Sequence, residues 1–234
     1  EDLEIPNGLT SYVAESIKVD NQITFKVKGV GFNLHLIGTF NVTNATLAVA
    51  AANYLGVSFE SAAEALSNIG SVPGRMEIFN LLNGSKVVVD YAPEPAAMRA
   101  SLQAVNLLSH GKIIHVFGST GGHRDVAKRF TFGEISAQFA DTIIITNDDV
   151  YDSDPKEIAK NIQEGINRAK VKKVKVVEVI LDRKEAINKA LNVAQPSDIV
   201  IITGKGSEQF LILPNDERIA WDDREVVKEL IKKL

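Results

Sequence analysis

The chain has 234 residues, enough for one or two domains, and its 26 Lys and Arg against 30 Asp and Glu give a formal net charge of −4. This near-balance argues against a protein that binds nucleic acid irrespective of sequence, because such proteins need a basic surface to displace counterions. Cysteine is absent, which excludes disulfides, thiolate zinc sites and a cysteine nucleophile, and no apolar run reaches the length of a membrane span or forms a signal peptide.

The first part of the chain predicts three short strands followed by two helices. The strand-like runs are residues 12–19, 22–27 and 31–37, and the helical patterns are residues 41–55 and 58–69. Turn signals at residues 20–21 and 28–29 separate the strands, and Ser58 is the expected N-cap of the second helix. The Gly- and Pro-containing stretch 70–74 then predicts a domain boundary, which divides the chain into residues 1–72 and 73–234.

After residue 74, apolar runs alternate with helical patterns. The expected strands are residues 86–90, 112–117, 141–146, 174–180 and 198–203, and the expected helices are residues 94–108, 126–139, 155–169 and 183–193. Strands that read as continuous Val and Ile are buried on both faces, and their alternation with helices predicts parallel βαβ units in a doubly wound α/β fold. The chain is expected to close with a hairpin, residues 210–213 and 218–221, and a helix over 222–234.

Nearly every dense polar or glycine-rich cluster follows the carboxyl end of a predicted strand. The clusters are residues 90–95, 118–125, 147–154, 181–183 and 204–208. The loops at the opposite ends of the strands, residues 109–111 and 171–173, are plainer. Because ligands of open parallel sheets bind in the crevice beyond the carboxyl ends of the strands, the sequence predicts a polar crevice along this edge.

The two glycine-rich clusters each leave two interpretations open. Residues 118–122 lie between a strand and a helix, where backbone N–H groups bind anions. They lack the G-x-G-x-x-G spacing, however, and can equally form a tight turn. Residues 204–207 are not a Walker A loop, because Ile199 stands where that loop needs Gly, and they can equally form a flexible turn.

Four Asp residues lie within residues 148–154. Asp154, followed by Pro155 and Glu157, is expected to cap a helix. Asp148 and Asp149 are not explained by capping, and they can bind an ammonium group or a metal, although the Gly that an EF-hand requires is missing.

The four histidines do not form a site. His115 lies in a buried strand and is expected to be a core residue, His110 lies on the plainer edge, and His123 lies on the crevice side. Together with His35 they lack metal-ligand spacing, so neither a metal site nor a Ser/His/Asp set is predicted.

Six segments, taken in order, resemble motifs of the Mur ligase family. They are Gly38-Thr-Phe-Asn-Val-Thr-Asn44, Val72-Pro-Gly-Arg-Met-Glu77, Val89-Asp-Tyr-Ala92, Val116-Phe-Gly-Ser-Thr-Gly-Gly-His-Arg-Asp125 with Lys128-Arg129, Gly204-Lys-Gly-Ser-Glu208 and Trp221-Asp-Asp-Arg-Glu225. Any one segment is weak evidence for the family, but the six segments in this order are specific to it. It points to the branch that adds the third residue to UDP-N-acetylmuramoyl-L-Ala-D-Glu.

This resemblance implies the identity of both predicted domains. Residues 73–234 would be the Rossmann-like C-terminal domain, which binds the amino acid. Residues 1–72 would be the strand-and-helix remnant of a truncated central ATP-binding domain. The chain opens with Glu1 and not with Met, so we expect a processed chain or an excised fragment. The family's P-loop, its carbamylated-Lys segment and its UDP-binding domain do not occur in these residues, so we expect no catalytic residue, no tightly bound cofactor and no ligation by this stretch alone.

The resemblance also implies the activity of the parent protein, an ATP-dependent amide ligase of peptidoglycan synthesis. ATP, with Mg²⁺, would form an acyl phosphate, and the amine of a diamino acid would then attack it. The ATP-binding residues would be Asn41, Asn44, Arg75 and Asp90. The amino-acid-binding residues would be Arg124, Asp148, Asp149, Tyr151, Gly204 and Glu208. The expected partners are these small molecules and neither nucleic acid nor membrane, and the expected state is a cytoplasmic monomer.

Three positions depart from the family pattern. Pro93 stands where the family has His after D-Y-A, Ser207 replaces another His, and the D-N-P-R segment appears as residues 148–151, with Tyr151 in place of the specificity Arg. The identity of the added amino acid therefore stays open. Two alternatives also stay open: another ligase of the superfamily, of the folylpolyglutamate or cyanophycin type, and a non-catalytic module that has kept only the ligand crevice.

Overall fold

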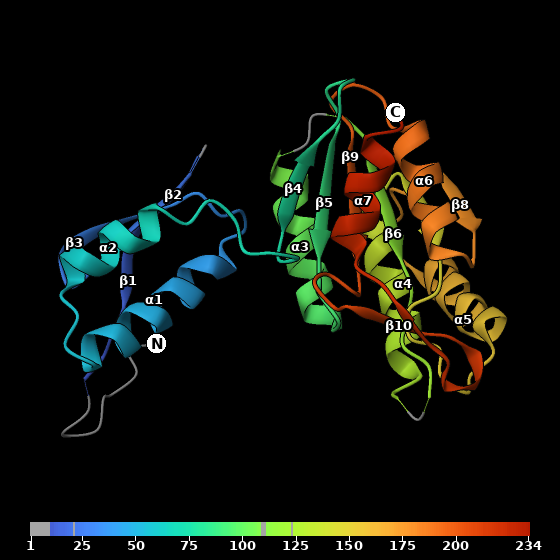
Figure 1. The fold of residues 1–234 in the computed structure, drawn as a ribbon, viewed down its shortest axis with the longest axis horizontal. Coiled ribbons are helices and arrows are strands. Elements are labelled where there is room, and N and C mark those ends of the chain that lie inside the picture. Colours follow the sequence, from blue (N-terminus) through green and yellow to red (C-terminus); the bar gives the residue numbers. More distant parts are fainter. Residues whose placement is uncertain (1–9, 21, 109–110, 123) are drawn as a thin grey trace. The chain divides into compact units, whose positions relative to one another are not determined.

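The computed structural model describes residues 10–234 except residues 21, 109–110 and 123 (Figure 1). The chain divides into two compact units, Glu1–Val72 and Pro73–Leu234, called unit 1 and unit 2 below. Asn21 of the first predicted turn, His110 and His123 lie outside the described residues. No helix among the described residues is long and apolar enough to cross a membrane.

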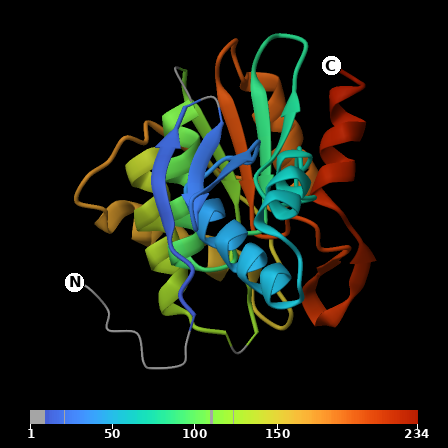
Figure 2. The same ribbon diagram turned by 90° about the vertical axis from the view of Figure 1, so that its left-hand side faces the viewer.

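Unit 1 is a small antiparallel sheet with two helices packed against it (Figure 2). Its strands are β1 (Ala14–Val19), β2 (Ile23–Val27) and β3 (Val30–Leu34), and its helices are α1 (Phe40–Tyr54) and α2 (Phe59–Ser67). Alternate residues of β2 are buried, as a strand with one covered face requires. The Ser58 hydroxyl accepts a hydrogen bond from the Ser61 N–H at 3.1 Å, so the predicted cap of α2 is confirmed.

Unit 2 is built on a six-stranded sheet in the order β4-β5-β9-β6-β7-β8 (Figure 1). Its strands are β4 (Glu77–Asn80), β5 (Lys86–Asp90), β6 (Ile113–Phe117), β7 (Thr142–Ile145), β8 (Val176–Val179) and β9 (Ile199–Thr203). All pairs in this sheet are parallel except β4 with β5. The doubly wound, mostly parallel α/β fold predicted for these residues is confirmed.

Helices cover both faces of this sheet (Figure 1). The helices α3 (Pro95–Leu108), α4 (Ala127–Phe139) and α5 (Pro155–Arg168) lie on one face, and α6 (Arg183–Val193) and α7 (Asp223–Ile231) lie on the other. The hairpin of β10 (Phe210–Ile212) and β11 (Arg218–Ala220) precedes α7, as predicted. The central strands β6 and β9 are buried at every residue, so the ends of these strands are fixed points on which a site can be built.

Both edge strands of the large sheet differ from the sequence expectation. Strand β4 was not predicted. It has only four residues, and half-buried Glu77 and Phe79 alternate with exposed positions, so its sequence has little of the apolar pattern that indicates a strand. Strand β8 was expected to be buried on both faces, and this was wrong, since Val176, Val177 and Val179 are exposed. An edge strand has only one neighbour in the sheet, and a β-branched run alone does not distinguish an edge from a centre.

Helices α4 and α5 cross closely because Gly133 and Gly165 lie at their contact. A Cβ on Gly165 would overlap the Phe130 carbonyl, and one on Gly133 would overlap the Ile162 carbonyl. We therefore expect Gly165→Ala to destabilise the fold by about 1–3 kcal/mol through overpacking, measured by urea unfolding. Asn167→Ala, on the exposed face of the same helix, is the control and should be neutral or slightly stabilising. Equal unfolding midpoints for the two variants would contradict this account of the crossing.

Candidate functional site

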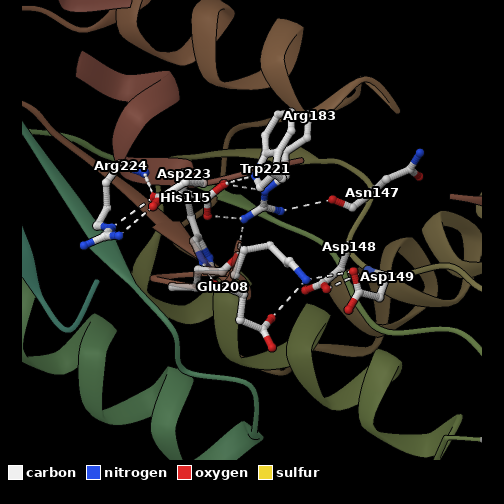
Figure 3. A network of polar contacts seen from close by, with 12 residues as sticks. His115, Asn147, Asp148, Asp149, Arg183, Glu208, Trp221, Asp223 and Arg224 are labelled. Carbon is white, nitrogen blue, oxygen red and sulfur yellow. Dashed lines mark hydrogen bonds and ion pairs between the residues drawn. The ribbon is translucent and has the colours of Figure 1, made fainter. Parts of the chain in front are cut away.

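The loops after β7 and β9 are joined by one buried ammonium group (Figure 3). The Nζ of Lys205 lies 2.7 Å from Asp149 Oδ1 and 2.9 Å from Glu208 Oε2, and this lysine is only 1% exposed. The Glu208 N–H donates to the Lys205 carbonyl, so a tight turn holds both charges of the β9 loop together. Asp149, Lys205 and Glu208, with Asp148 beside them, are called the acidic cluster below.

Asp148 is the deepest carboxylate of the acidic cluster. Its Oδ1 accepts a hydrogen bond from the Asp149 N–H at 2.7 Å, and its side chain is almost fully buried. Burial raises the pKa of Asp148, against the lowering effect of the Arg183 and Lys205 charges. Gly204 has a φ of +115°, and a Cβ there would overlap Asp148 Oδ2. The carboxylate therefore lies directly against the Gly204 backbone, where only glycine fits.

A second ion pair lies next to the cluster (Figure 3), and both of its side chains are fully buried. The Arg183 guanidinium, at the first residue of α6, binds both oxygens of Asp223 at 2.8 and 2.7 Å. Trp221 Nε1 donates to the same carboxylate at 2.8 Å. Both side chains of the ion pair have 0% exposure, so each charge depends entirely on the other and on neighbouring dipoles.

The first residues of unit 2 pack against the β9 loop. A Cβ on Gly74 would overlap the Ser207 amide nitrogen, and a Cβ on Gly206 would lie 2.6 Å from the Gly74 carbonyl oxygen. Arg75 lies over the Tyr91 ring, with its guanidinium carbon 4.5 Å from the ring centroid. The segment that enters unit 2 is thus in backbone contact with the loop that carries Lys205.

Asp90, the last residue of β5, is used inside the protein. Its Oδ1 accepts a hydrogen bond from the Met76 N–H at 3.1 Å, and its Oδ2 accepts one from the Ser101 hydroxyl. These two hydrogen bonds connect the segment that enters unit 2, and helix α3, to the end of β5.

The next residue, Tyr91, lies close to the acidic cluster. Burial raises the pKa of Tyr91, and the negative charge of Glu208 adds to this rise.

A cavity of about 340 Å³ adjoins the β6 and β7 loops. It is lined by Gly121, Gly122, Arg124, Tyr151, Asp152 and Asp216. The Gly121 N–H donates to the Asp149 carbonyl at 2.7 Å, which ties the lining of this cavity to the acidic cluster. Tyr151 has a positive φ of 52°, a conformation that side-chain-bearing residues rarely adopt and that turns the chain beside Gly122.

The glycine-rich loop after β6 uses two of its amides internally. Besides the Gly121 bond, the Gly122 N–H donates to the Ser153 hydroxyl at 2.9 Å. Gly118 lies so close to the β7 loop that a Cβ there would overlap the Thr146 carbonyl. These contacts favour the tight-turn interpretation of residues 118–122 over an anion cradle made by the same amides.

Two structural interpretations from the sequence are confirmed. His115 is completely buried, with Nδ1 2.8 Å from the Ser136 hydroxyl and Nε2 3.0 Å from the Thr203 hydroxyl. Asp154 caps α5 by accepting a hydrogen bond from the Lys156 N–H at 2.9 Å, with Pro155 next to it. Both residues therefore serve the fold.

The structure brings several of the predicted site residues together. Asp148, Asp149, Gly204 and Glu208 meet at one edge of the sheet, and Arg124 and Tyr151 line the adjoining cavity. In unit 1, the Asn44 amide donates to Asn41 Oδ1 at 3.1 Å, and the Asn41 amide donates to the Ile37 carbonyl at 2.8 Å.

Sequence reasoning missed the cations and their supports. It assigned no role to Lys205, Arg183, Trp221 or Asp223. The available signals were a lysine directly after a buried strand and an Arg that follows an N-cap Asp at a strand end. Among the residues that the structure describes, no group of three or more His, Asp or Glu side chains is arranged to hold a metal ion.

Comparison with known proteins gives one family model that matches residues 74–206, described as Mur ligase, glutamate ligase domain. The chain is 38% identical over 228 residues to UDP-N-acetylmuramoyl-L-alanyl-D-glutamate--2,6-diaminopimelate ligase of Caldanaerobacter subterraneus, which covers 97% of this chain and 44% of that protein. It is 39% identical over 241 residues to UDP-N-acetylmuramoyl-L-alanyl-D-glutamate--2,6-diaminopimelate ligase 1 of Clostridium acetobutylicum. This alignment covers 99% of this chain and 48% of that protein. The chain thus spans about half the length of the curated relatives it matches.

Solved structures give the same picture. A 2,6-diaminopimelate ligase structure aligns with a TM-score of 0.65 and 27% identity over 97% of this chain and 46% of that chain. The UDP-N-acetylmuramate-alanine ligase of Thermotoga maritima aligns with a TM-score of 0.67 over 95% of this chain and 45% of that chain. At 20% identity, the second likeness concerns the fold alone.

Proposed function

The chain belongs to the Mur ligase family, and we propose that its residues 73–234 form the amino-acid-binding domain of an ATP-dependent ligase. This ligase would add a diamino acid to UDP-N-acetylmuramoyl-L-Ala-D-Glu in peptidoglycan synthesis. The names of the relatives support this branch over the folylpolyglutamate and cyanophycin types. Residues 1–72 would be the end of the central ATP-binding domain, and the use of UDP-linked precursors and ATP supports a cytoplasmic location.

The observation that carries the proposal is the charge of the acidic cluster. Asp149 and Glu208 provide two carboxylates to one ammonium, that of Lys205, and Asp148, whose pKa is raised by burial, lies beside them, while the Arg183 charge is matched by Asp223. An ammonium group of the incoming diamino acid would supply a missing positive charge through charge-assisted hydrogen bonds. Arg124, at the adjoining cavity, would bind a carboxylate of the same molecule.

Holding the amino acid this way would present its free amine to an acyl phosphate. The amine would form the amide bond while the carbon–oxygen bond to phosphate breaks, which releases inorganic phosphate. Such catalysis is mainly positioning of the nucleophile against an activated acyl group. In this proposal, unit 2 contributes the nucleophile's site.

Unit 1 and unit 2 each contain residues proposed to act on ATP, and the contacts of these residues given below are those within their own unit. Asn44 is exposed and held at one end by Asn41, so its carboxamide is free to pair with the adenine edge. Arg75 is exposed and would reach the ribose or the phosphates. Because both Asp90 oxygens accept internal hydrogen bonds, we propose that Asp90 acts on the nucleotide indirectly, by fixing the segment that carries Arg75. Among the described residues no group of three or more His, Asp or Glu side chains could hold a metal ion, and no step of the proposal runs through Mg²⁺.

The proposed substrate is a diamino acid, and diaminopimelate and lysine are the two candidates to compare. The names of the relatives specify 2,6-diaminopimelate. In this chain Tyr151 stands where the family resemblance expects Arg, and Asp152 and Asp216 line the same cavity. A cavity with fewer cations would disfavour the second carboxylate of diaminopimelate, which lysine lacks. Titration with both compounds therefore separates the two candidates.

Glu208→Ala tests the assignment of the cluster. We expect it to weaken binding of the preferred diamino acid by at least tenfold, because a hydrogen bond to a charged group contributes about 1.5–3 kcal/mol. Isothermal titration calorimetry with lysine and diaminopimelate measures this. Glu217→Ala, an exposed carboxylate in the terminal hairpin, is the matched control and should bind as the unmodified chain does. Unchanged affinity in Glu208→Ala would refute the assignment.

A further inference from the structure

Arg183 connects two strands that are not neighbours in the sheet. Strands β7 and β9 both pair with β6 and lie on either side of it. The Arg183 Nη1 donates to the Asn147 carbonyl, just beyond β7, at 3.1 Å, and Nη2 donates to the Thr203 carbonyl, the last of β9, at 3.0 Å (Figure 3). One planar group therefore fixes the separation of two loops across the end of β6.

The residues that follow these two carbonyls belong to the proposed amine site. Asp148 comes directly after Asn147, and Gly204 comes directly after Thr203. A Cβ on Gly204 would overlap Asp148 Oδ2, so the carboxylate fills the space next to this glycine, and a small change in the separation of the loops would move it away.

The guanidinium itself has no surface for a substrate. Its remaining bonds go to both oxygens of Asp223, whose Oδ1 also accepts from Trp221, and its side chain has 0% exposure. Lysine could not replace it, because an ammonium is a point donor and lacks the fork that pairs with a carboxylate while reaching two carbonyls.

We propose that Arg183, held by Asp223, is a positioning residue that sets the spacing of Asp148 and Gly204 and thereby the shape of the amine-binding cluster. The part that concerns affinity rests on the proposed function of that cluster. The part that concerns the loops does not.

Amide hydrogen exchange on the whole chain tests the loop part without any ligand. Three backbone N–H groups report on the loops. The Gly204 N–H donates to the Tyr91 carbonyl, and the Gly121 N–H donates to the Asp149 carbonyl. The Ile212 N–H donates to Asp149 Oδ1. In Arg183→Lys, we expect these amides to exchange at least tenfold faster, beyond any change shared by the rest of unit 2. The control is Ile187→Val, which removes one methylene from a fully buried residue of the same helix.

Calorimetric titration with lysine and diaminopimelate then tests the affinity part. Arg183→Lys should weaken binding at least tenfold, whereas Ile187→Val should not change it. If Ile187→Val loosens the same amides and loses the same affinity, or if Arg183→Lys changes neither, Arg183 is only a structural residue and the proposal fails. If the unmodified chain binds neither amino acid, the proposed function fails while the exchange experiment still decides the role of Arg183. Should Arg183→Lys not fold, Asp223→Asn keeps the guanidinium, weakens its anchor and carries the same comparison.

Discussion

Replacing Asp223 with Ala is expected to destabilise unit 2 by about 3–5 kcal/mol, because it leaves the buried Arg183 charge without its counter-ion. The guanidinium would keep its bonds to the Asn147 and Thr203 carbonyls, but neutral acceptors do not replace a bidentate carboxylate. Trp221 would also lose the acceptor of its indole N–H. Urea unfolding measures the loss.

Two comparisons show whether the loss comes from the unpaired charge. The double variant Arg183→Met with Asp223→Leu removes both charges and should recover much of the stability, since apolar replacements of a buried pair are often tolerated. Glu164→Ala breaks the exposed pair with Arg168 on α5 and should cost less than about 1 kcal/mol. A double variant as unstable as Asp223→Ala would mean that packing, and not charge, explains the effect.

Acid should destabilise the protein through His115. Burial, with the nearby Arg183 charge, lowers the pKa of His115 from 6.5 to about 3. The unfolded chain takes up a proton below pH 6.5, whereas the folded chain resists it until about pH 3. The stability that neutral His115 provides is therefore complete above pH 6.5 and declines as the pH falls, by about 1.4 kcal/mol per unit and by about 5 kcal/mol in all.

The contribution of His115 appears as a difference between two pH profiles. His115→Gln cannot take up a proton in this range, so its stability should fall less steeply between pH 7 and pH 4.5, by about 2–3 kcal/mol over that interval. The carboxyl groups titrate in both proteins, so their contributions to the pH dependence of the unfolding free energy cancel in the difference. Urea unfolding at several pH values provides the two curves, and parallel curves would show that His115 does not limit acid stability.

The central part of the fold could be predicted because its local signals are strong. The runs that became β5, β6, β7 and β9 are apolar, short and bounded by polar residues, as strands buried on both faces are. Edge strands give no comparable signal. Strand β4 is half exposed, and β8 has the composition of a central strand but only one neighbour, so burial there depends on tertiary order and not on local pattern.

The outline of the candidate site followed from topology, but its interior did not. Parallel strands end at one edge, and this predicts that the loops carrying Asp148 and Gly204 lie along the same edge of the sheet. The inward direction of Lys205 and the pairing of Arg183 with a residue 40 positions away depend on packing distances that no local pattern contains. Sequence also gave no sign that Asp90 accepts hydrogen bonds from Met76 and Ser101, which gives it a structural role.

The close approach of Gly74 to Gly206 determines where unit 2 can be cut from the chain. A truncated form that starts at Glu77 would lack the Met76 N–H that binds Asp90 and would expose the backbone of the Lys205 loop to water. Unit 2 expressed by itself for crystallography or titration should accordingly begin at or before Pro73, so that the first few residues still pack against the Lys205 loop.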